Sequence, residues 1–201
     1  MTTTVGIVCR TGIVLSSDHR ATMGHFIASK EAKKLHQLDT HTGITLAGSV
    51  GDALKLISWI SIEASLYKFR RGESMTVKAI TRLLSNILNG SRVYPYSVAF
   101  IIGGVDKNGA TLYSTDGVGG VIEETMYAST GSGSVIAYGV LEDRYRQEMD
   151  TDDGIELAVR ALHTAMQRDS ASGNGIKIVV IDADGYKEIS DETIARVREN
   201  L

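Results

Sequence analysis

The chain has 201 residues with a net charge of -3, and 43% of its residues are hydrophobic. This size suits one domain with a sizeable core, so we predict a single domain over residues 1–201. Lys and Arg are scattered without a basic block, which argues against nucleic acid as a partner. The first residues do not resemble a signal peptide, no apolar run reaches membrane-spanning length, and Cys9 is the only cysteine. We therefore expect a soluble, cytoplasmic protein without a disulfide, a metal or a cofactor.

Strand patterns fill the first fifty residues. The predicted strands, which are short apolar runs bounded by turn residues, are Thr4–Cys9, Ile13–Ser17, Leu35–Leu38 and Thr42–Ala47. Apolar residues then recur at the i, i+3, i+4 and i+7 spacing of an amphipathic helix over Asp52–Phe69 and again over Thr76–Leu88. Gly72 follows the first helix, where glycine accepts the left-handed conformation that ends many helices.

The second half repeats this order of strands and then helices. Its predicted strands are Ser97–Gly103, Ala110–Thr115, Ile122–Ala128 and Ile176–Asp182. A loop over Ser129–Ser134 is expected to lead into helices over Val135–Gln147 and Asp152–Arg168, and a last helix is expected over Asp191–Arg198. Because strands and helices are grouped in blocks, we predict an α+β fold with two facing sheets and a helix pair on each outer face.

The start of the chain offers a candidate nucleophile. Thr2 directly follows Met1, and its small side chain permits removal of Met1 by an aminopeptidase. The freed α-amino group has a reference pKa of about 7.7–8.0 and could serve as the base that a threonine hydroxyl needs. A threonine paired with its own amine is a known variant of the serine triad. Taken alone, however, the segment is more simply a polar start to a strand.

Further polar residues lie at the ends of predicted elements. Asp18 follows a strand and Lys34 precedes one, and a lysine near a second cation lowers the pKa of that neighbour. Gly48 ends a strand, where the absence of a side chain lets a backbone N–H approach a ligand closely. The hydroxyl and carboxyl groups that flank predicted helices are Ser132, Asp169 and Ser172. Individually these are compatible with a surface ion pair, a turn, a helix cap and a solvated loop.

Patterns for other chemistries are weak. The five histidines form no pair at i, i+4 spacing, and His36 and His41 are better explained as surface or core residues than as metal ligands. No GxSxG motif occurs, and the glycines at 117, 119 and 120 lack the lysine of a phosphate loop. A conventional serine hydrolase or nucleotide site is therefore poorly supported.

Seven segments together resemble the β subunits of the proteasome core particle, most closely those of the archaeal type. They are TTTVG at Thr2–Gly6, SDHRAT at Ser17–Thr22, KKLHQLD at Lys33–Asp39, LAGSVGDA at Leu46–Ala53, ASTGSGS at Ala128–Ser134, YGVLE at Tyr138–Glu142 and RDSASG at Arg168–Gly173. The resemblance covers nearly the whole chain, and the joint match is far more specific than any one segment. It implies a four-layer αββα sandwich, the N-terminal nucleophile hydrolase fold. It also implies a threonine endopeptidase whose partners are other β subunits in a heptameric ring, α-subunit rings, a regulatory ATPase cap and unfolded polypeptide substrates.

The resemblance also assigns roles to the residues named above. It implies that Thr2 is the nucleophile and that its freed amine takes part in proton transfer. Lys34 would lower the pKa of the Thr2 hydroxyl, and Asp18 would orient Lys34. The backbone N–H of Gly48 would donate to the oxyanion, a contribution often worth ~3–4 kcal/mol. The residues that would hold the amine by hydrogen bonds are Ser132, Asp169 and Ser172.

A substrate pocket is implied among uncharged side chains, which favours apolar substrate residues in a chymotrypsin-like preference. The residues of this expected pocket are Ala21, Thr22, Ala32, Leu46, Ala47, Val50 and Leu54. Many family members cleave off a propeptide that ends in glycine. Only Met1 precedes Thr2 here, so ordinary methionine removal is the simpler expected route.

Three alternatives are weighed against this interpretation. A non-catalytic β-type ring subunit would lack one or more of the catalytic residues, and here all are present. The related bacterial two-ring protease that works with an ATPase cap starts with a similar threonine, but the YGVLE and RDSASG segments are not expected together in it. An unrelated binding module would leave the joint pattern unexplained.

Overall fold

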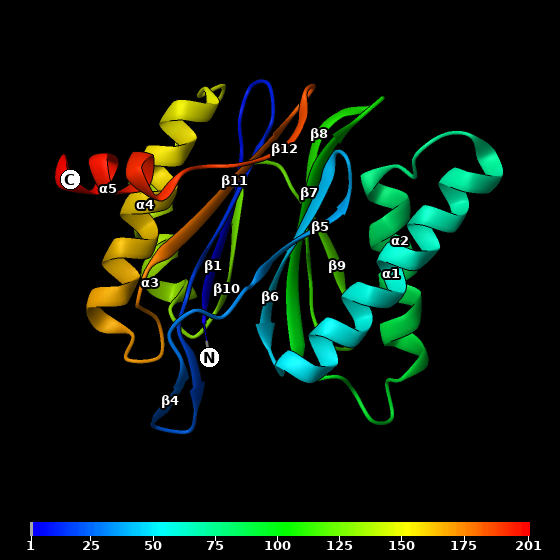
Figure 1. Ribbon diagram of the computed structural model, residues 1–201, viewed down its shortest axis with the longest axis horizontal. Helices are drawn as coiled ribbons and strands as arrows, with labels where there is room; N and C mark the ends of the chain where they lie inside the picture. The colour runs from blue at the N-terminus through cyan, green and yellow to red at the C-terminus, as the bar shows by residue number, and fades with distance from the viewer. Residues whose placement is uncertain (1) are drawn as a thin grey trace.

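Two five-stranded antiparallel sheets face each other in the computed structural model, which describes residues 2–201 (Figure 1). The first sheet has the order β10 (Tyr127–Gly131), β1 (Thr3–Val8), β2 (Ile13–Asp18), β11 (Ile176–Asp182) and β12 (Gly185–Glu188). The second has the order β5 (Leu35–Asp39), β6 (Thr42–Gly48), β7 (Val98–Asp106), β8 (Gly109–Thr115) and β9 (Val121–Glu124). A short hairpin of β3 (Ala21–Met23) and β4 (Phe26–Ser29) projects from the lower edge in Figure 1.

Helices cover both outer faces of the two sheets (Figure 1). Against the second sheet lie α1 (Val50–Arg71) and α2 (Val77–Gly90), and against the first lie α3 (Ser134–Arg144) and α4 (Thr151–Arg168). The last helix, α5 (Asp191–Glu199), packs on α4 and β11. The predicted four-layer αββα sandwich is therefore confirmed. None of the helices in residues 2–201 combines the length and the hydrophobicity that a membrane crossing requires.

The core has three parts, one between the sheets and one under each helix layer. Apolar and polar residues do not alternate in β7 because both faces of the strand are covered. Phe100 and Ile102 face the helices, while Ile101 faces the other sheet. The sheets approach closely at Gly6, where an added Cβ would lie 2.8 Å from Ile101 Cγ2. Phe100, Ile101 and Ile102 are fully buried, and the close approach at Gly6 packs the centre of β1 directly against β7.

Two sequence predictions for the middle of the chain are wrong. The single strand expected over Ile122–Ala128 is two strands, β9 and β10, which belong to different sheets. The expected loop over Ser129–Ser134 is β-strand as far as Gly131, because these polar residues pair with Thr3–Val5 of β1. Sequence patterns also missed the β3–β4 hairpin and β12, which are short and largely exposed or half-buried.

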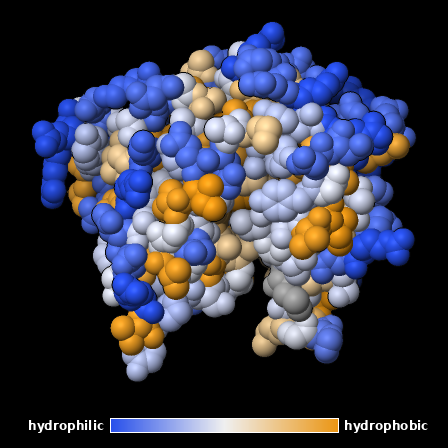
Figure 2. Space-filling view, turned by 180° about the vertical axis from the view of Figure 1, so that it is seen from behind, coloured by the Kyte–Doolittle hydropathy of each residue, from blue (hydrophilic) through white to orange (hydrophobic). Residues whose placement is uncertain are grey.

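The topology brings several strand ends to one edge of the sandwich. Because β1 and β2 are antiparallel, the start of β1 lies beside Asp18 at the end of β2. Antiparallel pairing likewise brings Gly131 opposite Thr3 and Ile176 opposite Asp18. The same edge, at the bottom of both views, is notched in the space-filling view (Figure 2). This edge therefore gathers the start of the chain, the end of β10 and the loop between α4 and β11.

Candidate active site

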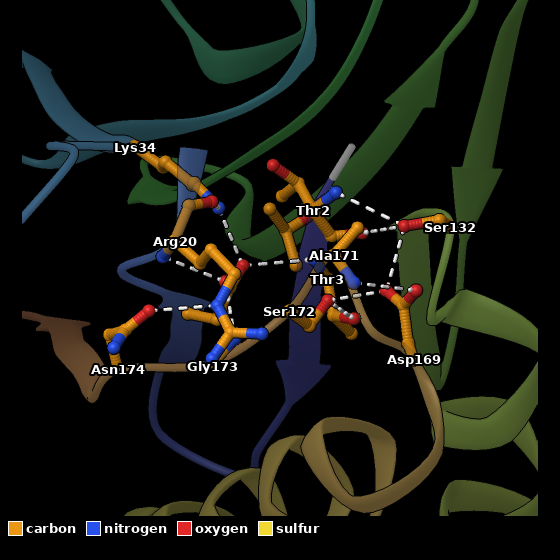
Figure 3. Close-up of polar contacts among 12 residues, drawn as sticks. Thr2, Thr3, Arg20, Lys34, Ser132, Asp169, Ala171, Ser172, Gly173 and Asn174 are labelled. Atoms are coloured by element: carbon orange, nitrogen blue, oxygen red, sulfur yellow. Dashed lines mark hydrogen bonds and ion pairs between the residues drawn. The ribbon is translucent and has the colours of Figure 1, made fainter. Parts of the chain in front are cut away.

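Thr2 lies immediately before β1, at the gathered edge. Its backbone N–H donates a hydrogen bond to Ser132 Oγ at 3.2 Å (Figure 3). The backbone around it is tightly packed, since a Cβ added to Gly131 would lie 2.0 Å from the Thr2 carbonyl oxygen. The predicted removal of Met1 concerns a residue outside those described. The structure thus fixes the position of the Thr2 nitrogen through the Ser132 hydroxyl.

A buried ion pair forms the floor of the site. Lys34 Nζ lies 2.6 Å from Asp18 Oδ1, and the two side chains are 3% and 0% exposed. Asp18 also accepts hydrogen bonds from the backbone N–H groups of Thr3, Arg20 and Gly173 at 2.9–3.0 Å. A buried charge is tolerated when it is paired and its remaining hydrogen-bonding capacity is filled, as it is here. Four donors therefore hold the Asp18 carboxylate, and the carboxylate holds Lys34.

Lys34 experiences two opposing influences on its pKa. Burial is the larger and lowers the pKa of Lys34 below its usual range, while the nearby Asp18 carboxylate raises it. The ammonium also donates to the carbonyl oxygen of Arg20 at 2.6 Å. With Asp18 and Arg20 both accepting from it, Lys34 is fixed in direction as well as in position.

A second polar group lies on the other side of Thr2. Asp169 Oδ2 accepts hydrogen bonds from Ser132 Oγ at 2.7 Å and from Ser172 Oγ at 2.6 Å (Figure 3). These residues come from the β10–α3 and α4–β11 connections, which are far apart in the sequence. The chain Thr2–Ser132–Asp169 therefore links the start of β1 to the loop that follows α4.

Gly48, the last residue of β6, has a backbone that only glycine adopts readily. Its φ is +105°, and an added Cβ would lie 2.1 Å from the carbonyl oxygen of Ser97. Gly48 and Thr2 line the same cavity. The strand end thus presents backbone, without a side chain, to the cavity that Thr2 also lines.

This cavity has a volume of about 400 Å³ and lies between the β3–β4 hairpin, the start of β5 and the start of α1. Six of the seven residues expected in the substrate pocket line it: Ala21, Thr22, Ala32, Leu46, Val50 and Leu54. Ala47 does not, because successive side chains of a strand point to opposite faces and its neighbours Leu46 and Gly48 are the ones that border the cavity.

Three lining residues were not anticipated from the sequence: Ser29, Lys33 and His36. Ser29 escaped because its hairpin was not predicted, and His36 because its strand carries no pattern that shows which face is open. Burial lowers the pKa of His36 below the usual range of imidazole, and its Nε2 lies 3.3 Å from the carbonyl oxygen of Lys33. The cavity is therefore less uniformly apolar than the sequence suggested.

The contacts of Thr3 and Arg20 were not predicted either, although these residues lie in the TTTVG and SDHRAT segments. The Arg20 guanidinium donates to Asn174 Oδ1 at 2.8 Å and to the carbonyl oxygen of Ser170 at 2.7 Å. It thereby fastens the loop after α4 to the segment that carries Asp18. Such contacts depend on the folded arrangement, and only the adjacency of Arg20 to Asp18 in the chain hinted at them.

The site provides a hydroxyl with a fixed nitrogen, a buried ammonium and a backbone approach at Gly48, all around one cavity. It lacks the His, Cys and carboxylate clusters that hold metals, as far as residues 2–201 show. The two facing sheets, the outer helix layers and the threonine at the start of a central strand define the fold of N-terminal nucleophile hydrolases.

Comparison with known proteins narrows this class to one family. The sequence profile described as "Proteasome subunit" matches residues 1–181. "Proteasome subunit beta" of Methanohalophilus mahii is 60% identical over 200 residues, which cover 100% of this chain and 95% of that protein. The proteins of the same name from Methanococcoides burtonii and Methanosarcina mazei are 58% and 57% identical with the same coverage. The chain belongs to the proteasome subunit family and is of its archaeal beta type. Membership in this family implies a protease built from several subunits.

Proposed function

We propose that the chain is a catalytic β subunit of a proteasome core particle and acts as a threonine endopeptidase on unfolded polypeptides. The observation that carries the proposal has two parts. The Thr2 nitrogen donates a hydrogen bond to Ser132, and Thr2, Lys34 and Gly48 line one cavity. A non-catalytic ring subunit would not need a buried ion pair and a hydroxyl network directed at one threonine. Both are costly to build, because buried charges and hydroxyls must all find partners.

Removal of Met1 is the step that activates the site in this proposal. While Met1 is attached, the nitrogen of Thr2 is an amide and cannot accept a proton. After removal it is an amine whose pKa lies near neutral pH, where a general base is most effective. One N–H of this amine donates to Ser132, which leaves its lone pair free to accept the hydroxyl proton.

The reaction then follows in two halves. Thr2 Oγ1 attacks the carbonyl carbon of the substrate while its proton passes to the Thr2 amine. The oxyanion accepts a hydrogen bond from the Gly48 N–H, and the Lys34 ammonium stabilises developing negative charge on Oγ1. The peptide C–N bond breaks as the amine returns the proton to the leaving nitrogen. Water then hydrolyses the ester on Thr2, with the same amine accepting and returning a proton.

The cavity supports a preference for apolar residues on the acyl side of the cleaved bond. Its walls include Ala21, Leu46, Val50 and Leu54 beside Thr2. Selectivity from such walls is about 1–3 kcal/mol per methylene-sized mismatch. Peptides ending in Leu, Phe or Tyr should therefore be cut faster at neutral pH than peptides ending in Arg or Asp, which is the chymotrypsin-like preference.

We further propose assembly in heptameric β rings between α-subunit rings, with a regulatory ATPase cap and a cytoplasmic location. Exposed apolar side chains are consistent with a chain made for partners, among them Phe26, Trp59, Phe69 and Tyr94. Their exposures run from 44% to 88% in the isolated chain. Light scattering should therefore show a monomer or partial assemblies for the chain alone and a large particle with its α partner.

The proposal is tested by peptide hydrolysis with particles assembled from the α partner and wild-type chain, Thr2→Ala or Thr2→Ser. Thr2→Ala should assemble and lose all peptidase activity, whereas Thr2→Ser should keep part of it because hydroxyl and amine both survive. Lys34→Ala should cost nearly as much as Thr2→Ala, since residues that act as a unit are not additive. Undiminished hydrolysis by assembled Thr2→Ala would refute the proposal.

A further inference from the structure

Thr3 connects the two polar groups that flank Thr2. Its side chain is fully buried, and its Oγ1 lies 2.6 Å from Ser172 Oγ (Figure 3). Its backbone N–H donates to Asp18 Oδ1 at 3.0 Å, on the same oxygen that binds Lys34. One residue therefore contacts both the ion pair and the hydroxyl network, although the proposed mechanism gives it no role.

The direction of each hydrogen bond in this network follows from counting protons. A carboxylate only accepts, so the single protons of Ser132 and Ser172 both point to Asp169 Oδ2. Ser172 then has no proton left for its contact with Thr3, and the Thr3 hydroxyl must be the donor. The Ser132 hydroxyl also lies 3.4 Å from the Thr2 carbonyl oxygen, but its proton goes to the carboxylate at 2.7 Å, and its lone pairs accept from the Thr2 nitrogen.

The network also has little freedom to rearrange. A Cβ added to Gly133 would lie 2.0 Å from Thr3 Oγ1, so the loop that carries Ser132 packs directly on the Thr3 hydroxyl. Ser172 is 1% exposed, so bulk water does not reach its hydroxyl to replace a missing donor. Thr3 and Ser172 thus form a buried end of the network, whereas Asp169 is partly buried and Ser132 is exposed.

We propose that Thr3 is a positioning residue of this site, whose hydroxyl donates to Ser172 and so holds Ser172, Asp169 and Ser132 in the arrangement that positions the Thr2 nitrogen. The proposal rests on the proposed peptidase function. Thr3 does not line the substrate cavity, so it acts on the orientation of the amine and not on substrate binding.

Thr4 offers a matched control on the same strand. It is also fully buried, and its Oγ1 bonds to Thr130 Oγ1 at 2.7 Å and to Thr45 Oγ1 at 3.2 Å. Because side chains alternate along a strand, Thr4 faces the second sheet, away from Ser172 and Asp169. Thr4→Val therefore removes a buried hydroxyl from β1 without touching the network at Thr2.

The test compares assembled particles of wild type, Thr3→Val, Thr3→Ser, Thr4→Val and Thr2→Ala in hydrolysis of one fluorogenic peptide ending in Leu. Thr3→Val should lower kcat about three- to tenfold, the rate equivalent of one net hydrogen bond, with KM unchanged. Thr3→Ser should restore at least half of the loss, because it keeps the donor. Thr4→Val should keep the wild-type kcat and KM at temperatures where its particle is assembled.

Three results would overturn the proposal. One is a wild-type kcat in assembled Thr3→Val. Another is an equal fall in kcat for Thr3→Val and Thr4→Val, which would make the effect one of general destabilisation. The third is a fall in Thr3→Val that Thr3→Ser does not restore. Failure of the proposed function would look different, because wild type and Thr2→Ala would then have the same activity.

Discussion

Neutralising Asp18 should expose the energetic role of the buried ion pair. In Asp18→Asn the amide keeps one oxygen and places an NH2 group where the other carboxylate oxygen was. Each carboxylate oxygen accepts from two donors, so the NH2 group must face two of them whichever way the amide turns. Lys34 also loses the carboxylate with which it forms the ion pair, although its side chain stays buried at 3% exposure.

The magnitude follows from removing one partner of a buried pair, which typically costs about 3–5 kcal/mol in free energy of unfolding. Loss of the carboxylate also removes the largest of the influences that raise the pKa of Lys34, so burial lowers that pKa further and favours the neutral amine. Stability of Asp18→Asn should then rise with pH as Lys34 loses its proton in the folded chain, because the unfolded chain retains more protons there.

Urea unfolding of the isolated chain measures the effect. Asp143→Asn is the control, since Asp143 and Arg144 form a pair of similar length, 2.7 Å, with side chains 71% and 61% exposed. Exposed pairs of this kind contribute little, and Asp143→Asn should unfold as wild type does. In the double variant Asp18→Asn with Lys34→Met, part of the lost stability should return because no unpaired charge stays buried. Equal unfolding of Asp18→Asn and Asp143→Asn would refute this reasoning.

Two further variants test the cavity. Gly48→Ala should lower the free energy of unfolding by about 1–3 kcal/mol and reduce kcat. The reason is that the added Cβ would lie 2.1 Å from the Ser97 carbonyl oxygen, at a backbone φ of +105°. An unchanged melting temperature and kcat would contradict this. His36 should make the preference for substrates pH-dependent. Since burial lowers its pKa, His36 is neutral near pH 7 and gains its proton only as the pH falls, which adds positive charge beside Lys33. Between pH 7 and 5, where a glutamate substrate stays ionised, kcat/KM for peptides ending in Glu relative to Leu should rise in wild type and stay flat in His36→Gln.

The sequence predicted the layers well where periodicity was strong. Apolar spacing predicted helices over Asp52–Phe69 and Asp152–Arg168, and the structure has them over Val50–Arg71 and Thr151–Arg168. The apolar run Ile176–Asp182 is the strand it was predicted to be. It failed at Ser129–Gly131, because hydroxyl and glycine residues are typical of loops and only pairing with β1 makes them a strand. The β3–β4 hairpin failed for a related reason, since its residues are half-buried or exposed and show no alternation.

The site was predictable only as a set of separate residues. The family resemblance grouped Asp18, Lys34 and Ser132 in one predicted site. In the structure they lie around Thr2 because they stand at strand ends and in connections, whose positions in space the sequence spacing does not give. Thr3 had no signal of its own, because its role depends on a contact with Ser172 across 169 positions of the chain. Contacts of this kind become visible only when the two sheets and the loop after α4 are in place.

The central claim is that Thr2 forms the covalent bond to substrate once Met1 has been removed. It is tested most directly by treating the assembled particle with a peptide epoxyketone and mapping the adduct by tandem mass spectrometry. The account predicts one adduct per inhibited subunit, on a peptide that begins at Thr2, with both the hydroxyl and the amine of that residue consumed. An adduct on another residue, or full inhibition of particles whose subunits retain Met1, would contradict it.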